Sequence, residues 1–175
     1  MSLPVRIQAR VTLPEALRAR IDAVRMRWNP EVATGNPAHF TIVYHDEAPD
    51  PAVLRARLAH ACQQVSPFVV HLDGVARFPE PDRGAFLAVQ DPSGGVAALR
   101  RLVLSPPCTP RQRFGLHVTL LHPGQGERLA QAWPELSAVA GGASFRVEHV
   151  ELISSSGPHT RTLASLALAA SAPFP

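Results

Sequence analysis

The same four-residue pattern occurs twice in this chain, first as His39-Phe40-Thr41-Ile42 and again as His117-Val118-Thr119-Leu120. Each copy places a histidine two residues before a threonine, inside an apolar run that contains β-branched residues. Side chains alternate between the two faces of a β-strand, so the histidine and threonine of each copy should share one face, with the apolar residues packed behind them. Two such strands, 78 residues apart, predict a cleft that holds two imidazoles and two hydroxyls.

The composition is that of a globular protein. With 175 residues, 46% of them hydrophobic and 18% charged, the chain is long enough for one domain with a buried core and is not of the disordered class. No apolar run approaches the roughly 18 residues that span a bilayer, and residues 1–6 lack the apolar core of a signal peptide. We therefore expect a cytoplasmic protein without membrane contact, in which the isolated Cys62 and Cys108 are buried thiols.

The charge is mildly basic. All 17 basic residues are arginine, and the formal net charge is +3. Arginine binds phosphate bidentately, although the nucleotide composition of the genome alone can also account for the absence of lysine. This balance is compatible with a nucleotide or an RNA end as substrate and gives no indication of duplex DNA binding. We expect a monomer.

Hydrophobic periodicity and turn signals predict two successive units with the same order of elements, namely a helix, a motif strand, a second helix and a β-hairpin. The first unit, residues 14–90, has helices at 14–27 and 51–64 and strands at 39–44, 68–78 and 85–90. The second, residues 95–169, has helices at 95–104 and 127–136 and strands at 116–122, 145–153 and 161–168. Another strand, at 5–11, precedes both units.

This repetition predicts an α+β fold in one domain, residues 1–175, built from two pseudo-symmetric lobes. Two antiparallel-rich sheets would face each other across a central cleft, with the helices outside. The pattern does not indicate which strands are exchanged between the lobes.

Two facing histidines suit a reaction that needs a base on one side and an acid on the other, because imidazole titrates near neutral pH. On a 2′,3′-cyclic phosphate, one histidine would take a proton from the attacking water and the other would protonate the departing ribose oxygen. The threonine hydroxyls would donate to the non-bridging oxygens. Metal ligation is the alternative use of paired histidines, but no H-E-x-x-H motif or clustered ligand set is present, so we expect neither metal nor cofactor.

Three residues in or next to the two hairpin turns are candidate substrate contacts. Arg83 and Arg161 occupy matching positions in the two hairpin turns, again 78 residues apart, and either reaches a phosphate at the cleft rim or is a solvated turn residue. His159 lies in the last hairpin turn. Arg111 and Arg113, which precede the second motif, are weaker candidates.

Aromatic residues near element ends offer stacking surfaces for a base. Trp28, Phe78 and Phe114 are the candidates, with Phe114 preferred, although an aromatic at such a position is more often part of a core. His45 and His122 follow the motif histidines by six and five residues, and we interpret them as strand-end residues.

The paired motifs resemble those of the two-histidine (2H) phosphoesterase superfamily, in particular its 2′-5′ RNA ligase and 2′,3′-cyclic phosphodiesterase-like branch. The resemblance extends over nearly the whole chain. It implies a two-lobed, pseudo-symmetric fold in which His39 and His117 are the catalytic acid and base and Thr41 and Thr119 bind phosphate without metal. Relatives often carry a tyrosine shortly after the glycine of the last hairpin, where this chain has Gly157-Pro158-His159, so the contact at that position differs.

The resemblance implies a metal-independent phosphoesterase, a hydrolase acting on 2′,3′-cyclic phosphates of nucleotides or RNA ends. Joining of RNA ends through a 2′-5′ linkage is one alternative, and a non-catalytic module that binds a nucleotide or RNA end is another. Because the two motifs are nearly equivalent, the sequence does not distinguish the acid from the base.

Overall fold

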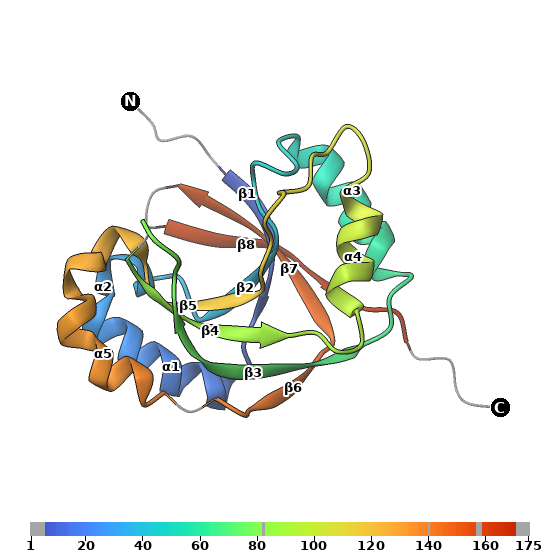
Figure 1. Ribbon diagram of the computed structural model, residues 1–175. Coiled ribbons are helices and arrows are strands. Elements are labelled where there is room, and N and C mark those ends of the chain that lie inside the picture. Colours follow the sequence, from blue (N-terminus) through green and yellow to red (C-terminus); the bar gives the residue numbers. More distant parts are fainter. Residues whose placement is uncertain (1–5, 82, 140, 157–158, 171–175) are drawn as a thin grey trace.

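The strands of the chain form one curled antiparallel sheet. The computed structural model describes residues 6–81, 83–139, 141–156 and 159–170 (Figure 1). Within these ranges the strands are β1 (Arg6–Thr12), β2 (His39–Val43), β3 (Phe68–Arg77), β4 (Ala85–Gln90), β5 (His117–Leu121), β6 (Ser144–Val147), β7 (His149–Ser156) and β8 (His159–Ala167). Their order across the sheet is β6-β3-β4-β5-β2-β1-β7-β8.

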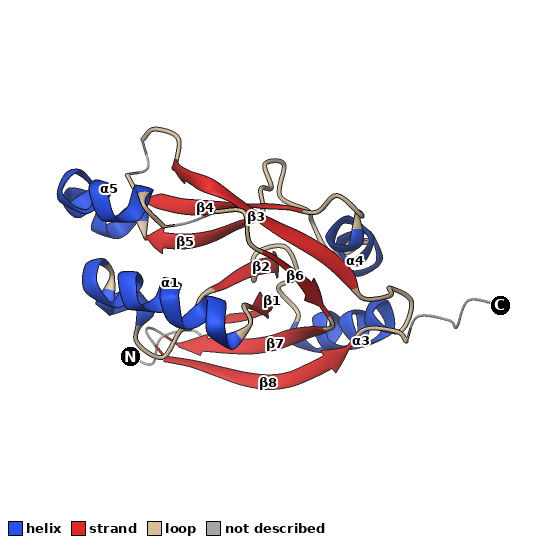
Figure 2. Ribbon diagram, turned by 90° about the horizontal axis from the view of Figure 1, so that it is seen from below, coloured by secondary structure: helices blue, strands red, loops and turns tan. Residues whose placement is uncertain are grey.

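The two motif strands are neighbours at the centre of this sheet. Strands β2 and β5 run antiparallel and pair through Phe40 and Val118. On one side of this junction lie β4, β3 and β6, and on the other lie β1, β7 and β8. Because the sheet curls, these two halves form separate layers when seen from below, with the helices outside them (Figure 2). The expected α+β fold with two antiparallel layers is therefore confirmed.

Each hairpin lies in the same half of the sheet as the motif strand of the other predicted unit. Strands β3 and β4 precede β5 in the chain, and β4 pairs with β5 rather than with β2. Strands β7 and β8 follow β5 but extend the other half of the sheet, because β7 pairs with β1 and β1 pairs with β2. One half of the sheet, with β1, β2, β7 and β8, is thus built from both ends of the chain, and the other half, with β3 to β6, from its middle.

Five α-helices and one 3₁₀ helix occur in the described ranges. They are α1 (Glu15–Trp28), α2 (Pro30–Ala33), α3 (Pro51–Cys62), α4 (Gly95–Val103), η1 (Pro123–Arg128) and α5 (Leu129–Ser137). Helix α3 begins where the sequence predicts, because the carboxylate of Asp50 accepts hydrogen bonds from the backbone N–H groups of Ala52 and Val53 at 2.8 and 3.3 Å. In the described part of the chain, no helix combines the length and the apolar character needed to cross a membrane.

Several predicted elements differ in detail. The single strand expected at 145–153 is two strands separated at Glu148, because β6 pairs with β3 whereas β7 pairs with β1 in the other half of the sheet. Strand β7 continues through Ser156, into the expected turn at 154–158, and residues 157 and 158 lie outside the described ranges. The short helices α2 and η1 were not predicted, since each is too short to show a helical apolar period.

The core lies directly behind the two motifs. Phe40, Ile42, Val118 and Leu120 are fully buried, as predicted from the alternation of side chains along a strand. Both cysteines are buried free thiols, also as expected. The apolar neighbours of the motif residues therefore fix β2 and β5 in place.

Gly95 allows α4 to begin against the ring of Phe68. A Cβ at this position would overlap three ring carbons of that side chain. We expect Gly95→Ala to lower the free energy of unfolding by about 1–3 kcal/mol, as overpacking does in a dense core. Urea unfolding measures the change, with Gly74→Ala as control, because a Cβ at Gly74 meets no atom within 4 Å. Equal stabilities of the two variants would contradict this packing.

Candidate active site

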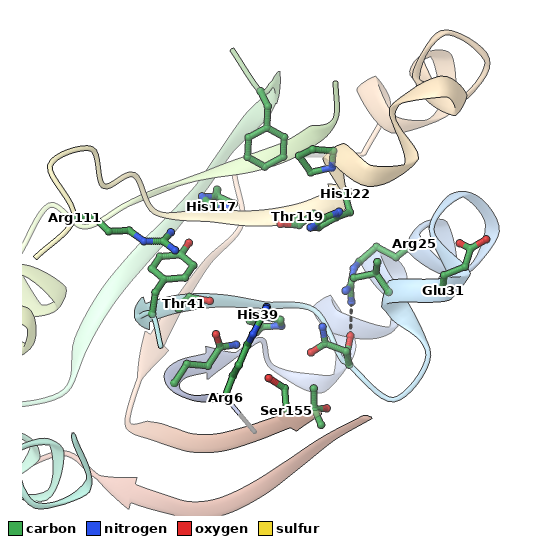
Figure 3. A pocket seen from close by; sticks show the side chains of 17 residues that line it. Arg6, Arg25, Glu31, His39, Thr41, Arg111, His117, Thr119, His122 and Ser155 are labelled. Carbon is green, nitrogen blue, oxygen red and sulfur yellow. Dashed lines mark hydrogen bonds between the residues drawn. The ribbon is translucent and has the colours of Figure 1, made fainter. Parts of the chain in front are cut away.

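One cleft, with a volume of about 710 Å³, is lined by the side chains of both motifs. His39 and Thr41 lie on β2 at one side, and His117 and Thr119 lie on β5 at the other (Figure 3). The antiparallel direction of the two strands sets His39 across from Thr119 and His117 across from Thr41. Each imidazole therefore faces a hydroxyl from the opposite motif.

Both motif histidines are held in the same tautomer. The Nδ1 atom of His39 lies 2.7 Å from the carbonyl oxygen of Pro37, and the Nδ1 atom of His117 lies 2.9 Å from that of Gly115. A carbonyl oxygen can only accept, so Nδ1 carries the hydrogen in each ring. The Nε2 atom of each neutral imidazole is then left with a lone pair, as a general base requires.

The protein environment favours the neutral form of both rings. The pKa of His39 is lowered to about 3, chiefly by burial and in addition by the guanidinium groups of Arg10 and Arg25 and the charge of His117. Burial also lowers the pKa of His117, against the opposing effect of its bond to Gly115. Burial is thus the largest cause for both rings, and at His39 the two buried arginines add to it.

Aromatic rings enclose His117 on its own side of the cleft. Phe78 lies edge-on to the imidazole with a centroid distance of 5.2 Å, and Phe86 lies at 5.5 Å. Phe78 also lines the cleft, which makes it the stacking candidate from the sequence that reaches this site. Thr41 is buried and Thr119 is half-buried, and both line the cleft.

A buried carboxylate connects the loops on both sides of the cleft. Glu47 is fully buried and accepts hydrogen bonds from the guanidinium of Arg100 at 2.6 and 3.0 Å. It also accepts from the backbone N–H groups of Tyr44 and Arg111, both at 2.9 Å. Burial alone would raise the pKa of Glu47, but these hydrogen bonds outweigh it and the pKa is lowered. Glu47 therefore holds the backbone of two residues that line the cleft.

Several lining residues were not among the sequence candidates, including Tyr44 and Arg25. The guanidinium of Arg111 lies 3.7 Å from the centre of the Tyr44 ring. Arg25 is buried and donates to Asp22 at 2.5 Å and to the carbonyl oxygen of Asn36 at 2.9 Å. Tyr44 is the fifth residue after His39, and His122 is the fifth after His117. This equal spacing from the two motif histidines is a sequence signal that could have placed both residues at the cleft.

His122, interpreted above as a strand-end residue, lines the cleft. Its Nδ1 atom accepts a hydrogen bond from the backbone N–H of Gly124 at 3.0 Å. The neutral ring therefore carries its hydrogen on Nε2, which is the opposite tautomer to that of the motif histidines. His122 thus offers a hydrogen-bond donor where His39 and His117 offer acceptors.

The remaining sequence candidates lie elsewhere. Arg83 and Arg161 are exposed, and neither is among the described residues that line the cleft. Phe114 packs under the guanidinium of Arg100, 3.4 Å from the ring centre, and so belongs to the support of the Glu47 loop. The side chain of His159 lies outside the described part of the structure. Trp28 donates from Nε1 to Glu135 at 2.7 Å, between helices α1 and α5.

Metal-ligating side chains are dispersed in the structure. Among the described residues, no group of three or more histidine, cysteine, aspartate or glutamate side chains could hold a metal ion.

Comparisons with known proteins agree with the fold. A family model described as the 2′-5′ RNA ligase superfamily matches residues 13–159. The chain is similar to E. coli LigT in its crystal structure with NADP+, with 22% identity and a TM-score of 0.64, covering 96% of this chain and 99% of that one. It is also similar to TT0787 of Thermus thermophilus, with 21% identity, a TM-score of 0.64 and coverage of 95% and 100%. A third similar crystal structure is named only as a phosphoesterase. It shares 23% sequence identity with this chain at a TM-score of 0.66, and the match covers 95% of this chain and 99% of that one. No curated protein sequence matches.

Proposed function

Because this chain belongs to the 2′-5′ RNA ligase superfamily, as the paired motifs indicated, we propose that it is a cyclic phosphodiesterase. It hydrolyses the 2′,3′-cyclic phosphate of a nucleotide or an RNA end, without a metal ion, in the cytoplasm. One observation carries the proposal: two imidazoles, each anchored through Nδ1, line one cleft together with two threonine hydroxyls.

The proton transfers follow from the environments of the two histidines. His39, kept neutral by burial and by Arg10, takes a proton on Nε2 from the attacking water. The water oxygen forms a new bond to phosphorus, and the bond from phosphorus to one ribose oxygen breaks. His117, protonated on Nε2, gives its proton to that oxygen. The product is a phosphomonoester, and exchange of protons with solvent restores both rings.

The threonines stabilise the charge on the phosphoryl group. Thr41 and Thr119 lie beside the opposite histidine, so their hydroxyls donate to the non-bridging oxygens while the imidazoles act in line. A nucleotide-type ligand is supported by relatives of the same fold, since E. coli LigT has been solved in complexes with 3′-AMP and with NADP+.

The direct test is turnover of nucleoside 2′,3′-cyclic phosphates in the presence of EDTA. We expect a nucleoside phosphomonoester as product, detected by chromatography. RNA halves that end in a 2′,3′-cyclic phosphate and a 5′-hydroxyl form the second arm, read on a gel. Joined RNA without hydrolysis would replace this proposal by end-joining, and binding without either product at high enzyme concentration would replace it by a non-catalytic module.

The pH dependence of kcat/KM follows from the lowered pKa values. This parameter reports groups of the free enzyme, and it requires one imidazole neutral and the other protonated. With the pKa of His39 at about 3 and that of His117 below its usual 6.5, kcat/KM falls as the pH rises through neutrality. A bound phosphate anion raises both pKa values, so the optimum for kcat lies at higher pH than that for kcat/KM. Steady-state profiles from pH 4 to 9 at constant ionic strength measure both, and a kcat/KM that rises between pH 6 and 8 would contradict the assignment.

A further inference from the structure

A second group of polar side chains lines the cleft away from the two histidines. Arg6 and Gln8 lie on β1, and Ser155 and Thr160 lie on β7 and β8. Arg6 pairs in register with Ser155, and Ser155 pairs with Thr160, so three of these residues form one row across adjacent strands. Gln8 lies two residues from Arg6 and therefore on the same face of β1. Figure 3 shows Arg6 and Ser155 on the β2 side of the cleft, below His39.

Arg6 differs from the other arginines of the cleft in its pairing. Of the arginines that line the cleft, Arg25 is paired with Asp22 and Arg111 with Asp46, at 2.5 and 2.8 Å. Within the described ranges, the Arg6 guanidinium has no hydrogen-bond or ion-pair partner. Arg6 is exposed and lines the cleft, so its five N–H donors are available to an anion with several oxygen atoms, such as a phosphate.

Two neighbouring side chains add uncommitted donors. Neither the amide of Gln8 nor the hydroxyl of Ser155 has a partner within the described part of the chain. Thr160 differs, because its hydroxyl donates to the carbonyl oxygen of Gly35 and so fastens β8 to the loop before β2. Arg6, Gln8 and Ser155 therefore remain as donors for a ligand.

Arg6 lies apart from the two motifs along β1. Thr12 and Arg10 are the β1 residues that pair with His39 and Thr41, and Thr41 faces His117, so Arg6 lies six residues from the level of His39 and four from that of His117. Four residues of extended strand span about 13 Å, which is longer than an arginine side chain. An anion held by Arg6 is therefore a different group of the same ligand from the phosphate between the histidines.

We propose that Arg6, Gln8 and Ser155 form a second anion subsite, which binds a phosphodiester upstream of the terminal phosphate of an RNA strand. The inference rests on the proposed function and specifies its substrate as an RNA end several nucleotides long rather than a mononucleotide. The subsite determines specificity for length, while the chemistry takes place at the histidines.

The test compares a tetraribonucleotide that ends in a 2′,3′-cyclic phosphate with the corresponding mononucleoside 2′,3′-cyclic phosphate. We expect the wild type to have the higher kcat/KM for the tetranucleotide, and Arg6→Gln to reduce that preference about tenfold, as loss of a charged hydrogen bond does. The slope of log(kcat/KM) against log[salt] for the tetranucleotide should fall by about 0.7, the value for one contact to a single strand. Arg55→Gln is the matched control, because Arg55 is exposed on α3 and outside the cleft.

The possible outcomes separate this inference from the proposed function. Hydrolysis of both substrates with no length preference, or with equal losses on both in Arg6→Gln, overturns the second subsite alone. If neither substrate is hydrolysed, the proposed function fails, and binding of a 5′-labelled, 3′-phosphorylated tetranucleotide decides the subsite by fluorescence anisotropy. Weaker binding to Arg6→Gln than to Arg55→Gln supports it, and equal binding overturns it.

Discussion

His39→Ala and His117→Ala should each lower kcat for a nucleoside 2′,3′-cyclic phosphate by roughly 10²- to 10⁴-fold. Each substitution removes an Nε2 atom that receives or donates a proton in the same step. The two rings act as a unit, so the double variant should be little worse than either single variant. Initial rates in EDTA, with phosphomonoester quantified by chromatography, give the comparison.

His60→Ala is the control for this series. His60 lies exposed on α3, where its ring is 2.6 Å from the side-chain amide of Gln64 and outside the cleft, so its loss should leave kcat unchanged. Circular dichroism melts must show that all variants remain folded at the assay temperature. Full activity in either motif variant would exclude the two-histidine mechanism, whereas selective loss of one side of the pH profile would identify the residue as acid or base.

The motif strands were predictable because the information is local. The alternation of His39 and Thr41 with Phe40 and Ile42 assigns one face to the cleft and the other to the core, and the structure has both faces as expected. Helix α3 was predictable for a similar reason, since Asp50 caps its first turn within the same short segment. Patterns with a period of two, or with a capping residue, depend only on neighbours in the sequence.

The exchange of hairpins and the walls of the cleft were not predictable in this way. Strand β4 pairs with β5, and Arg6 comes to line the cleft, through pairings between segments far apart in the chain. Arg83 and Arg161 show the converse, because equal spacing in two hairpin turns suggested a shared role, yet both side chains are exposed outside the cleft. Only the register between distant strands determines which polar residues meet.

Glu47→Gln should lower the free energy of unfolding by about 3–5 kcal/mol, the cost of breaking a buried ion pair from one side. The substitution preserves shape but removes the charge that compensates Arg100, whose side chain is only 11% exposed and also donates to the carbonyl oxygen of Ile42 in β2. It also weakens the acceptors for the backbone N–H groups of Tyr44 and Arg111. Urea unfolding at pH 7 measures the loss.

Asp46→Asn, one residue away, provides the matched control. Asp46 forms an exposed ion pair with Arg111, with side-chain exposures of 50% and 37%, so its loss should cost at most about 1 kcal/mol. The pKa of Glu47 is lowered in the folded protein, so its carboxylate stabilises the fold above its ordinary pKa of 4.5, and this contribution is lost as the pH falls through the folded value. The difference in stability between wild type and Glu47→Gln should therefore be largest above pH 4.5 and shrink below it. A difference that is small at pH 7, or that grows on acidification, would show that Glu47 does not support the two loops at the cleft.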